Sequence, residues 1–513
     1  MAGRAGRSIL ITAAHGLLHA LCSAATAFAQ QLPSFPGAEG FGAVASGGRG
    51  GAVLEVTRLD PDPAGLIPGS LNHALRQPGP RTVVFRVSGV IHGVARIVHG
   101  NLTLAGHTSP GGITVRGIVC DGHYERDDCS NLIIRHLRSR PAWQLPLPAG
   151  GERLDDGLRL DGTSRVMLDH LSIAHALDEA VQISWVNQLS LQDSVIAETV
   201  GEHASLGGML INYSHPDFPQ DALSIQRNLW YRIGGRLPEI SCESSGYPDQ
   251  PATRTQCQST PLRIELANNL YADPGFPLWY TRFVDDEPAH GPYRLQINMI
   301  GNRYLLRPAH PYGIAVSALL AEPANALHLA DNRASLYSDW LDAQLFWCCN
   351  DFPDSAPNAD PGLAQQLTQR HPFPALSQYR PSSVLQAELP GRVGALPSDP
   401  MDRRIAASAR SGVFPSLDYG TPVADDAFAL DFDPARPPPP PIDSDADGMP
   451  DSFESQHAGL GLNPLQQDHT GSQLSLPLLG TGGYDNLEVY LHLLAMARVD
   501  AAQSRVFGDG FEG

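Results

Sequence analysis

The stretch LDDGLRLDGTSRVMLDHLSIAHALDEAVQ, residues 154–182, alternates short apolar runs with acidic bends. Apolar side chains recur at every second position in three runs, a pattern typical of half-buried strands. Acidic residues stand at the bends: Asp155, Asp156, Asp169, Asp178 and Glu179. Asp156 and Asp178 are 22 residues apart, roughly one coil of a parallel β-helix. In such a coil the two carboxylates stack about 4.8 Å apart, which suits two ligands of one Ca²⁺ ion, whereas Asp169 is expected to be a structural turn.

The same short unit recurs from residue 82 to about residue 334, for example as TVVFRVSG, NLIIRHLRSR, QLSLQDSVI and RIELANNLY. Units spaced by roughly 20 to 40 residues predict a solenoid whose coils contact only their neighbours. We therefore expect an all-β chain with a parallel β-helix; a β-sandwich is the alternative. Longer intervals, 141–153 and 241–261, are expected to be loops on one face. Asparagines that follow the strands predict an internal turn with bonded side-chain amides: Asn228, Asn269, Asn302 and Asn332.

Composition limits the partners. The 513 residues are 42% hydrophobic and 17% charged, contain no lysine and carry a formal charge of −19. This charge argues against a nucleic-acid partner. It also disfavours a polyanionic substrate, unless a cation or an arginine cluster reverses the field locally.

The N-terminus predicts export. Arg4 and Arg7 precede an apolar run and an Ala27-Phe28-Ala29 cleavage site, so residues 1–29 are expected to be a cleaved signal peptide and the protein secreted, extracellular or periplasmic. A membrane anchor is the alternative, disfavoured because His15 and His19 interrupt the run. No later segment is apolar enough to span a bilayer, and we expect a monomer.

Six cysteines follow the signal peptide, which suggests disulfides in an exported chain. Cys120 with Cys129, and Cys242 with Cys257, would close short loops. The pairing of the adjacent Cys348 and Cys349 stays open. A zinc site is not expected, because the chain has no CxxC pair.

The segments around the repeats have simpler interpretations. Glycines in FPGAEGFGAVASGGRGG, residues 35–51, are expected to allow tight turns where the first coil forms. No GK[ST] sequence follows, which disfavours a phosphate-binding loop. Residues 70–76 are expected to form a short helix over the open end of the core.

The C-terminal third divides at a proline run. We expect the β-helix domain to span residues 30–425, with a tail from about residue 335 that wraps its outside. Residues 426–442 are read as a linker, because they end in the stiff run Pro437–Pro441. A module at 443–498 and a tail at 499–513 follow; the final VFGDGFEG has no assignment.

The module begins with a calcium-loop motif. DSDADGMPDSFE, residues 443–454, matches D-x-D-x-D-G-x₅-E in full. Its expected Ca²⁺ ligands are Asp443, Asp445, Asp447, Asp451 and Glu454. Residues 482–497 predict a helix that packs on the loop. The motif resembles the thrombospondin-type-3 or dockerin-like calcium modules of secreted bacterial enzymes, so a structural role is expected; a solvated acidic turn is the alternative.

Several motifs, taken together and in order, resemble the pectate lyases of polysaccharide lyase family 1. They are FPGAEGFGAVASGGRGGAVLEVT, PGSLNHALR, RTVVFRVSGVI, LTLAGHTSPGGITVRG, NLIIRHLRSRP, VMLDHLSIAHALDEAV and RLP, across about residues 35–340. PMDRRIAASARSG, residues 400–412, is similar to the tail of that family's outlying bacterial members. The resemblance implies a right-handed parallel β-helix that binds Ca²⁺ and cleaves polygalacturonate by β-elimination.

The resemblance also implies residue roles. Asp156 and Asp178 match the family's calcium-binding aspartates, and Gln182 stands where a third ligand is expected. Arg236 matches the first arginine of R-x-P-x-x-R, the proposed base, although a guanidinium pKa normally exceeds 12. Among the arginines of these coils, Arg232 and Arg159 are assigned to substrate binding. Most of the others are expected to be surface charges: Arg135, Arg138, Arg140 and Arg165.

The chain departs from the family pattern in three ways. Ser241 replaces the motif's second arginine, Gln182 replaces an aspartate, and no lysine is present to hold the substrate. The leading hypothesis is a calcium-dependent lyase acting on an acidic plant polysaccharide. The alternatives are a non-catalytic glycan-binding β-helix and a polygalacturonase-type hydrolase that uses Asp155 and Asp156.

Overall fold

The computed structural model describes residues 1, 32–201, 203, 206–214, 218–241, 257, 260–280, 293–347 and 356–508. Residues 2–29 of the predicted signal peptide, Cys242, Cys348 and Cys349 lie outside these residues. Leu32–Gly513 form one compact unit. Among the described helices, none is both long and apolar enough to cross a bilayer.

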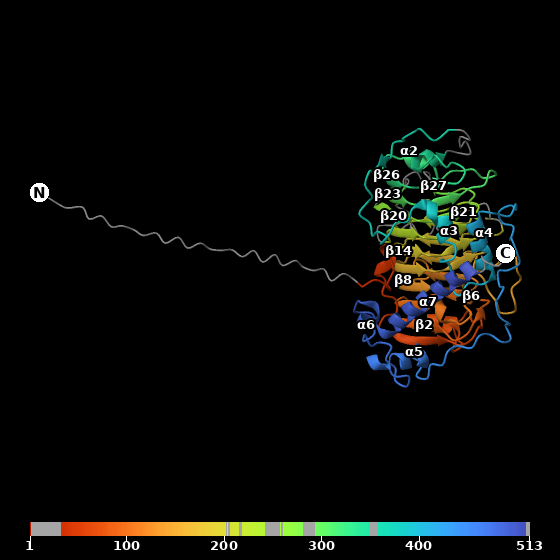
Figure 1. The fold of residues 1–513 in the computed structure, drawn as a ribbon, viewed down its shortest axis with the longest axis vertical. Coiled ribbons are helices and arrows are strands. Elements are labelled where there is room, and N and C mark those ends of the chain that lie inside the picture. Colours follow the sequence, from red (N-terminus) through yellow and green to blue (C-terminus); the bar gives the residue numbers. More distant parts are fainter. Residues whose placement is uncertain are drawn as a thin grey trace. The chain divides into compact units, whose positions relative to one another are not determined.

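Three parallel sheets, here called A, B and C, form the body of this unit. The chain visits them in the repeating order C, A, B: β10 (Leu158–Asp161) lies in sheet C, β11 (Ser164–Asp169) in A and β12 (Ser172–Ala174) in B. The next coil, which starts with β13 (Val181–Ser184), pairs in parallel with this one. The predicted parallel β-helix is therefore confirmed, with its coils stacked as Figure 1 shows.

The remaining strands repeat the same path. Sheet A also contains β1 (Ala52–Val56), β2 (Arg81–Phe85), β5 (Leu102–Ala105), β8 (Ser130–Arg135), β14 (Asn187–Gln192), β17 (Asp221–Gln226), β20 (Pro261–Ala267), β23 (Arg294–Ile300), β26 (Ala326–Ala330) and β29 (Gln365–Gln366). Sheet B also contains β3 (Gly89–Val90), β6 (Ile113–Val115), β9 (Arg138–Ser139), β15 (Val195–Ala197), β18 (Leu229–Tyr231), β21 (Leu270–Ala272), β24 (Arg303–Leu305) and β27 (Arg333–Ala334). Sheet C also contains β4 (Ala95–Arg96), β7 (Ile118–Asp121), β16 (Met209–Asn212), β19 (Glu239–Ile240) and β22 (Trp279–Tyr280). Strands β25 (Ala315–Val316) and β28 (Phe346–Trp347) pair with each other.

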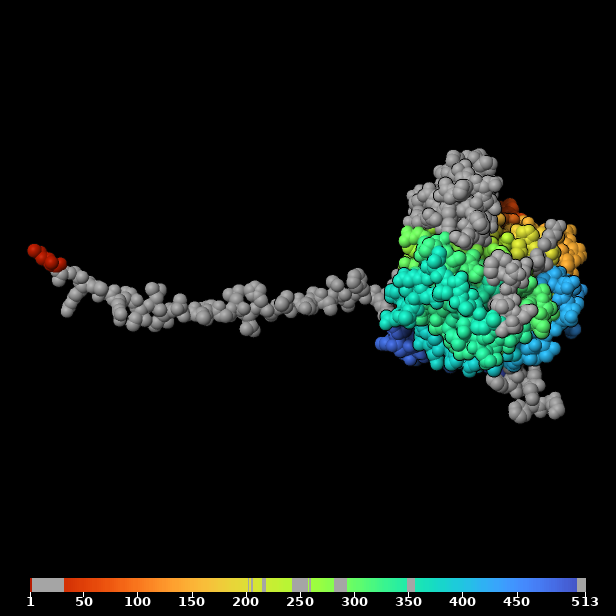
Figure 2. All heavy atoms as spheres, turned by 90° about the horizontal axis from the view of Figure 1, so that it is seen from above, coloured from red at the N-terminus to blue at the C-terminus, as the bar shows by residue number. Residues whose placement is uncertain are grey.

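The core runs along the inside of the stack, because each strand places alternate side chains inward. Its largest cluster continues through successive coils as inward-facing Leu, Ile and Val side chains. The predicted asparagine turn is confirmed: the Nδ2 of Asn228 donates to Oδ1 of Asn269 at 3.1 Å, and Asn269 donates to Asn302 at the same distance. Asn302 continues the ladder to Asn332 at 2.8 Å. One end of the stack is formed by the last coils and the segment after them, green and cyan in Figure 2.

The glycine-rich segment 35–51, expected to form tight turns, also packs closely against the β-helix. It crosses the outer face of sheet A, where the 3₁₀ helix η1 (Phe41–Val44) packs on β11 and β14. A Cβ at Gly42 would lie 2.1 Å from the carbonyl oxygen of Val166, and one at Gly48 would lie 2.0 Å from that of Arg81. Glycine is therefore required for close backbone approach, which sequence reasoning did not anticipate.

Short helices cover the stack. The helix predicted at 70–76 is confirmed as α1 (Leu71–Leu75), capped by the Ser70 hydroxyl. The others are α2 (Ala318–Ala321), α3 (Leu385–Glu388), α4 (Pro400–Ser411), α5 (Asp451–Gln456), α6 (Ser475–Leu479) and α7 (Asn486–Gly508), with 3₁₀ turns η2 (Gly106–Thr108), η4 (Asp342–Leu345), η5 (Ser382–Val384) and η6 (Ala458–Leu460). Helix α7 begins later and runs eleven residues further than the predicted 482–497.

Helix α4 and the residue before it bury two of the arginines that were expected on the surface. The apolar face of the helix packs on sheet B through Met401, Ile405 and Ala409. Arg140, fully buried, pairs with Asp399 at 2.5 Å and with Asp402 at 2.8 Å. Arg138 pairs with the same two carboxylates, and Arg135 pairs with Asp169. The expectation of surface charges is wrong for these three. Asp399 and Asp402, far along the chain, pair with Arg138 and Arg140, and Asp169 of the next coil pairs with Arg135. Of the four arginines, only Arg165 is exposed.

Candidate active site

One row of side chains on sheet C faces outward across successive coils. Arg159 is level with Gln182, Gln182 with Leu210, and Leu210 with Glu239. The strand neighbours of these residues point inward and are buried. Because residues at every second position share a face, this row and the residues just before each strand form one continuous outer surface.

Asp156 lies just before β10, and the structure corrects its partner. Leu158 pairs with Val181, so a coil here is one residue longer than the predicted spacing, and Asp156 is level with Glu179. The backbone N–H of Glu179 donates to Oδ1 of Asp156 at 3.1 Å. Burial raises the pKa of Asp156 well above its usual value, and the negative charge of Asp178 raises it further. Both predicted aspartates therefore lie in this region, but Glu179 occupies the level expected for Asp178.

A group that can hold a cation forms beside Asp156. Asp178, Glu179 and His203 each offer a ligand atom, and these atoms lie within 4.8 Å of one another. Oδ1 of Asp178 is 2.5 Å from Nδ1 of His203. The Glu179 side chain is 1% exposed, and its Oε2 has no hydrogen-bond partner. Sequence reasoning did not identify Glu179 or His203 as candidate ligands. Glu179 could be placed level with Asp156 only once the length of the coil was known, and His203 lies in a loop that has no strand pattern.

Arg236 reaches this group from two strands away in sheet C. The pairing of Leu210 with Glu239 continues back to place Gly207 level with Arg236. Gly207 is likewise level with Glu179 by the pairing of Val181 with Met209. Across this intervening level, the Arg236 guanidinium binds the Oε1 of Glu179. Its Nε also pairs with Glu239 Oε2 at 2.8 Å.

Arg159 and Gln182 remain on the outer row. The Nε of Arg159 pairs with Asp161 Oδ2 at 2.7 Å, and 34% of its side chain is exposed. Opposing its own burial, the carboxylates of Asp161 and Asp156 raise the pKa of Arg159. Gln182 is half-buried beside it. These positions are compatible with contact to a ligand lying across sheet C.

Arg232 does not share this surface. Its side chain is 2% exposed, and its Nη1 pairs with Asp273 Oδ2 at 3.0 Å. The same guanidinium donates to the carbonyls of Pro415 and Leu417. The assignment of Arg232 to substrate binding is therefore wrong: it anchors the wrapping tail, a partner that lies about 180 residues further along the chain. Ser241 is also buried, next to the end of β19.

The calcium-loop motif forms a second acidic group. Ligand atoms of Asp443, Asp445 and Asp447 lie within 4.8 Å of one another, as do those of Asp447, Glu454 and Asp468. Burial and the neighbouring carboxylates raise the pKa of Asp445 to about 6 and that of Glu454 to about 8.

The structure corrects one predicted ligand of this loop. The carboxylate of Asp451 accepts from the N–H and the hydroxyl of Ser444, at 2.7 and 2.8 Å, and is not part of either acidic group. Asp451 is the first residue of α5, so its side chain closes the turn instead. Asp468, which lies outside the twelve-residue motif, joins the group in its place.

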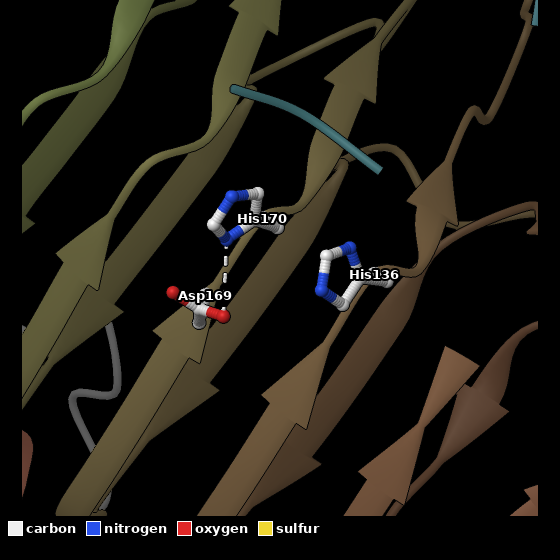
Figure 3. Close-up of side chains that lie close together, drawn as sticks. All are labelled: His136, Asp169 and His170. Carbon is white, nitrogen blue, oxygen red and sulfur yellow. Dashed lines mark ion pairs between the residues drawn. The ribbon is translucent and has the colours of Figure 1, made fainter. Parts of the chain in front are cut away.

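A third group, His136, Asp169 and His170, is structural (Figure 3). Asp169 Oδ2 accepts from Arg135 Nε at 2.8 Å, and Oδ1 accepts from Gln192 at 2.7 Å. His170 and Arg135, acting against burial, hold the pKa of Asp169 well below its usual value. Because its oxygens are already used within the protein, Asp169 acts in the turn, as the sequence suggested.

The disulfide predictions are partly tested. Cys120 and Cys129 form a disulfide that closes the short loop after β7. Cys257 is also disulfide-bonded, while its expected partner, Cys242, lies outside the described residues.

Comparison with known proteins extends the sequence resemblance. No protein-family model matches the chain. The chain is 27% identical over 483 residues to "Probable pectate lyase C" of Aspergillus flavus, covering 92% of this chain and 96% of that protein. It is 35% identical over 223 residues to "Probable pectate lyase C" of Emericella nidulans, covering 43% of this chain and 47% of that protein.

Solved structures similar to the chain include the cedar pollen allergen jun a 1, with a TM-score of 0.42, 12% identity, and coverage of 70% of this chain and 93% of that one. Pectate lyase II of Xanthomonas campestris has a TM-score of 0.38 and 13% identity, with coverage of 70% and 98%. At these scores the sheet pairing within this chain, rather than the likeness, establishes the fold. The chain is thus similar, over nearly its whole length, to proteins named as pectate lyases.

Proposed function

We propose that this protein is an exported, calcium-dependent polysaccharide lyase that cleaves polygalacturonate by β-elimination. The observation that carries the proposal is the contact of Arg236 with Glu179, which joins the expected proton acceptor to the group of Asp178, Glu179 and His203 that lies beside Asp156. The similarity to proteins named pectate lyase supports the substrate class. The disulfide between Cys120 and Cys129, together with the expected signal peptide, supports export.

The residues at the site fit calcium. Asp156, Asp178 and Glu179 offer carboxylate oxygens, the ligands that Ca²⁺ prefers. Two of them are almost fully buried, and the Oε2 of Glu179 has no hydrogen-bond partner. Burying such carboxylates is costly unless a cation compensates them. Calcium, when bound here, would neutralise a uronate carboxylate and make its C5 proton more acidic.

The chain's own residues then have distinct roles. Asp156, Asp178 and Glu179 fix the acidic end of the site, and Arg159 presents a guanidinium that pairs with a uronate carboxylate. Arg236, in its neutral form after giving one proton to solvent, accepts the C5 proton; the C5–H electrons form the C4–C5 double bond, and the C4–O bond breaks. The departing oxygen takes a proton from water, leaving an unsaturated uronide at the new non-reducing end.

Access of Arg236 to the substrate requires an exchange of partners. In the structure its guanidinium binds the carboxylates of Glu179 and Glu239. Such charge-assisted contacts are strong where solvent is excluded. Binding of the polysaccharide must therefore replace at least one of them.

Ultraviolet absorbance of the unsaturated product tests the proposal. Full-length protein is incubated with polygalacturonate, with calcium and with a chelator, and we expect absorbance to rise only with calcium. Arg236→Lys should abolish this rise, whereas Arg165→Lys should not; both arginines have left-handed backbone angles, with φ of 57° and 56°, and Arg165 is exposed. New reducing ends without absorbance would indicate a hydrolase. Binding without either product would indicate a glycan-binding protein.

A further inference from the structure

The carboxylates at the start of the C-terminal module are buried or half-buried, unlike those of a solvated turn. Glu454 is 0% exposed, and neither of its oxygens has a hydrogen-bond partner. One oxygen each of Asp443, Asp445 and Asp468 is also buried without a partner. A buried carboxylate without a partner costs free energy that a bound cation recovers.

Among the described residues, a single long ion pair reaches this group. The nearest guanidinium, that of Arg86, lies 3.8 Å from the Asp443 oxygen and also pairs with Glu55 at 3.4 Å. The unpartnered oxygens of Glu454 and Asp468 form no ion pair with the described residues. Carboxylate oxygens without nitrogen or sulfur donors favour calcium over transition metals.

Two separate segments meet at this group. Asp443, Asp445, Asp447 and Glu454 belong to the loop and to α5, whereas Asp468 lies in the connection toward α6. The N–H of Asp468 donates to Oδ2 of Asp447 at 3.0 Å. Asn486, at the start of α7, in turn donates to the carbonyl of Asp468 at 2.8 Å. Atoms that would bind one ion are thus tied directly to the long C-terminal helix.

The same segment is docked on the first coils of the β-helix. Met449, within the loop, packs with Ala105, Leu487 and Leu491 in one buried cluster. Glu488 of α7 accepts from Arg49 Nε at 2.8 Å. The ring of His107 is 3.1 Å from the carbonyl of Leu491. Figure 1 shows α7 lying across these coils, near β2 and β8.

We propose that one Ca²⁺ ion, bound by Asp443, Asp445, Asp447, Glu454 and Asp468, is a structural clamp that holds residues 443–508 against the first coils of the β-helix. It is separate from the site at Asp178 and Glu179 and does not depend on the proposed activity. The ion joins the loop to the segment before α6 and so fixes the start of α7. Without it, the mutual repulsion of five carboxylates loosens this attachment.

Calcium stoichiometry of the full-length protein tests the site. Isothermal titration with calcium alone should show two classes of site in the wild type. Glu454→Gln or Asp468→Asn should remove one class, while Asp451→Asn should keep both. Asp178→Asn should affect the other class only. Unchanged stoichiometry in both Glu454→Gln and Asp468→Asn would overturn the proposal.

Hydrogen exchange of the wild type tests the clamp without relying on a variant that folds. Amides of α7 should exchange at least about tenfold faster in chelator than in calcium, while those of β14 and β17 should change little. Asp178→Asn should retain this calcium response, and Glu454→Gln should lose it. Exchange in α7 that is independent of calcium would contradict the clamp, whatever the lyase assay shows.

Discussion

The guanidinium of Arg236 binds the buried carboxylate of Glu179, two strands away in sheet C, across the position of Gly207. This contact links the residue expected to accept a proton to the group expected to hold calcium. It also makes Glu179, to which the sequence analysis assigned no role, a central residue of the site.

Replacing Glu179 should affect both halves of the site. Glu179→Gln removes a carboxylate donor and one of the two acidic partners of Arg236, so we expect weaker calcium binding and turnover about 10²-fold lower. Glu239→Gln is the matched control, because Glu239 binds Arg236 but is outside the cation-binding group. Calorimetry should show wild-type calcium affinity for Glu239→Gln; the same result for Glu179→Gln would argue against its role as a ligand.

Asp156→Asn should have opposite effects on stability with and without calcium. Burial and Asp178 disfavour the charged form of Asp156, so removing the charge should raise the unfolding free energy of the calcium-free protein by about 1 kcal/mol. In calcium the variant should be less stable than the wild type, because a ligand is lost. Thermal unfolding in chelator and in calcium measures both. Destabilisation of equal size in the two conditions would mean that Asp156 is only a structural carboxylate.

Stability should fall in mild acid because of His136. This ring is fully buried; burial first, and then the charges of His170, His107 and Arg135, lower its pKa well below the usual value, against the opposing effect of Asp169. The unfolded chain therefore binds a proton below about pH 6.5 that the folded chain does not, so the contribution of His136 is complete above that pH and is lost as pH falls.

The matched variant is His136→Asn, whose amide oxygen can replace Nδ1 as acceptor from the N–H of Leu396. Urea unfolding measures the free energy of unfolding at pH 7 and at pH 5. Its decrease between the two pH values should be smaller in the variant than in the wild type by roughly 2 kcal/mol. Equal losses in the two proteins would show that His136 does not titrate in this way.

The asparagine ladder should be costly to interrupt. Asn269 is fully buried, accepts from Asn228 and donates to Asn302 and to the carbonyl of Ile225. Asn269→Ala leaves these groups unpaired and should cost about 3 kcal/mol. Gln365→Ala, at an exposed strand position, should change stability by less than about 0.5 kcal/mol. Chemical denaturation compares the two, and similar small effects would indicate that water replaces the ladder.

Much of the fold could be predicted because it depends on local patterns. Alternating apolar residues indicate strands, and regular recurrence indicates coils that contact only their neighbours. Asn228, Asn269, Asn302 and Asn332 follow their strands at equivalent positions, so their ladder was predictable too. The cover of sheet B was not, because Arg140 meets Asp399 only through folding of a segment about 260 residues away.

The candidate site was predicted in part for the same reason. The spacing of Asp156 and Asp178 indicated one coil, but a count of residues cannot fix strand register when turn lengths vary. One additional residue in this coil places Glu179 level with Asp156. His203 and Asp468 come from connections whose paths have no periodic signal. Arg232 has a guanidinium that could bind a carboxylate, but the tail segment that buries it lies far along the chain, so the sequence around Arg232 does not indicate its burial.

Mass spectrometry of the products formed from polygalacturonate tests the central claim most directly. With the wild-type protein and calcium, we predict oligouronides with an unsaturated residue at the new non-reducing end, and none with Arg236→Lys or in chelator. Saturated oligouronides, or unsaturated products formed equally by Arg236→Lys, would contradict the account.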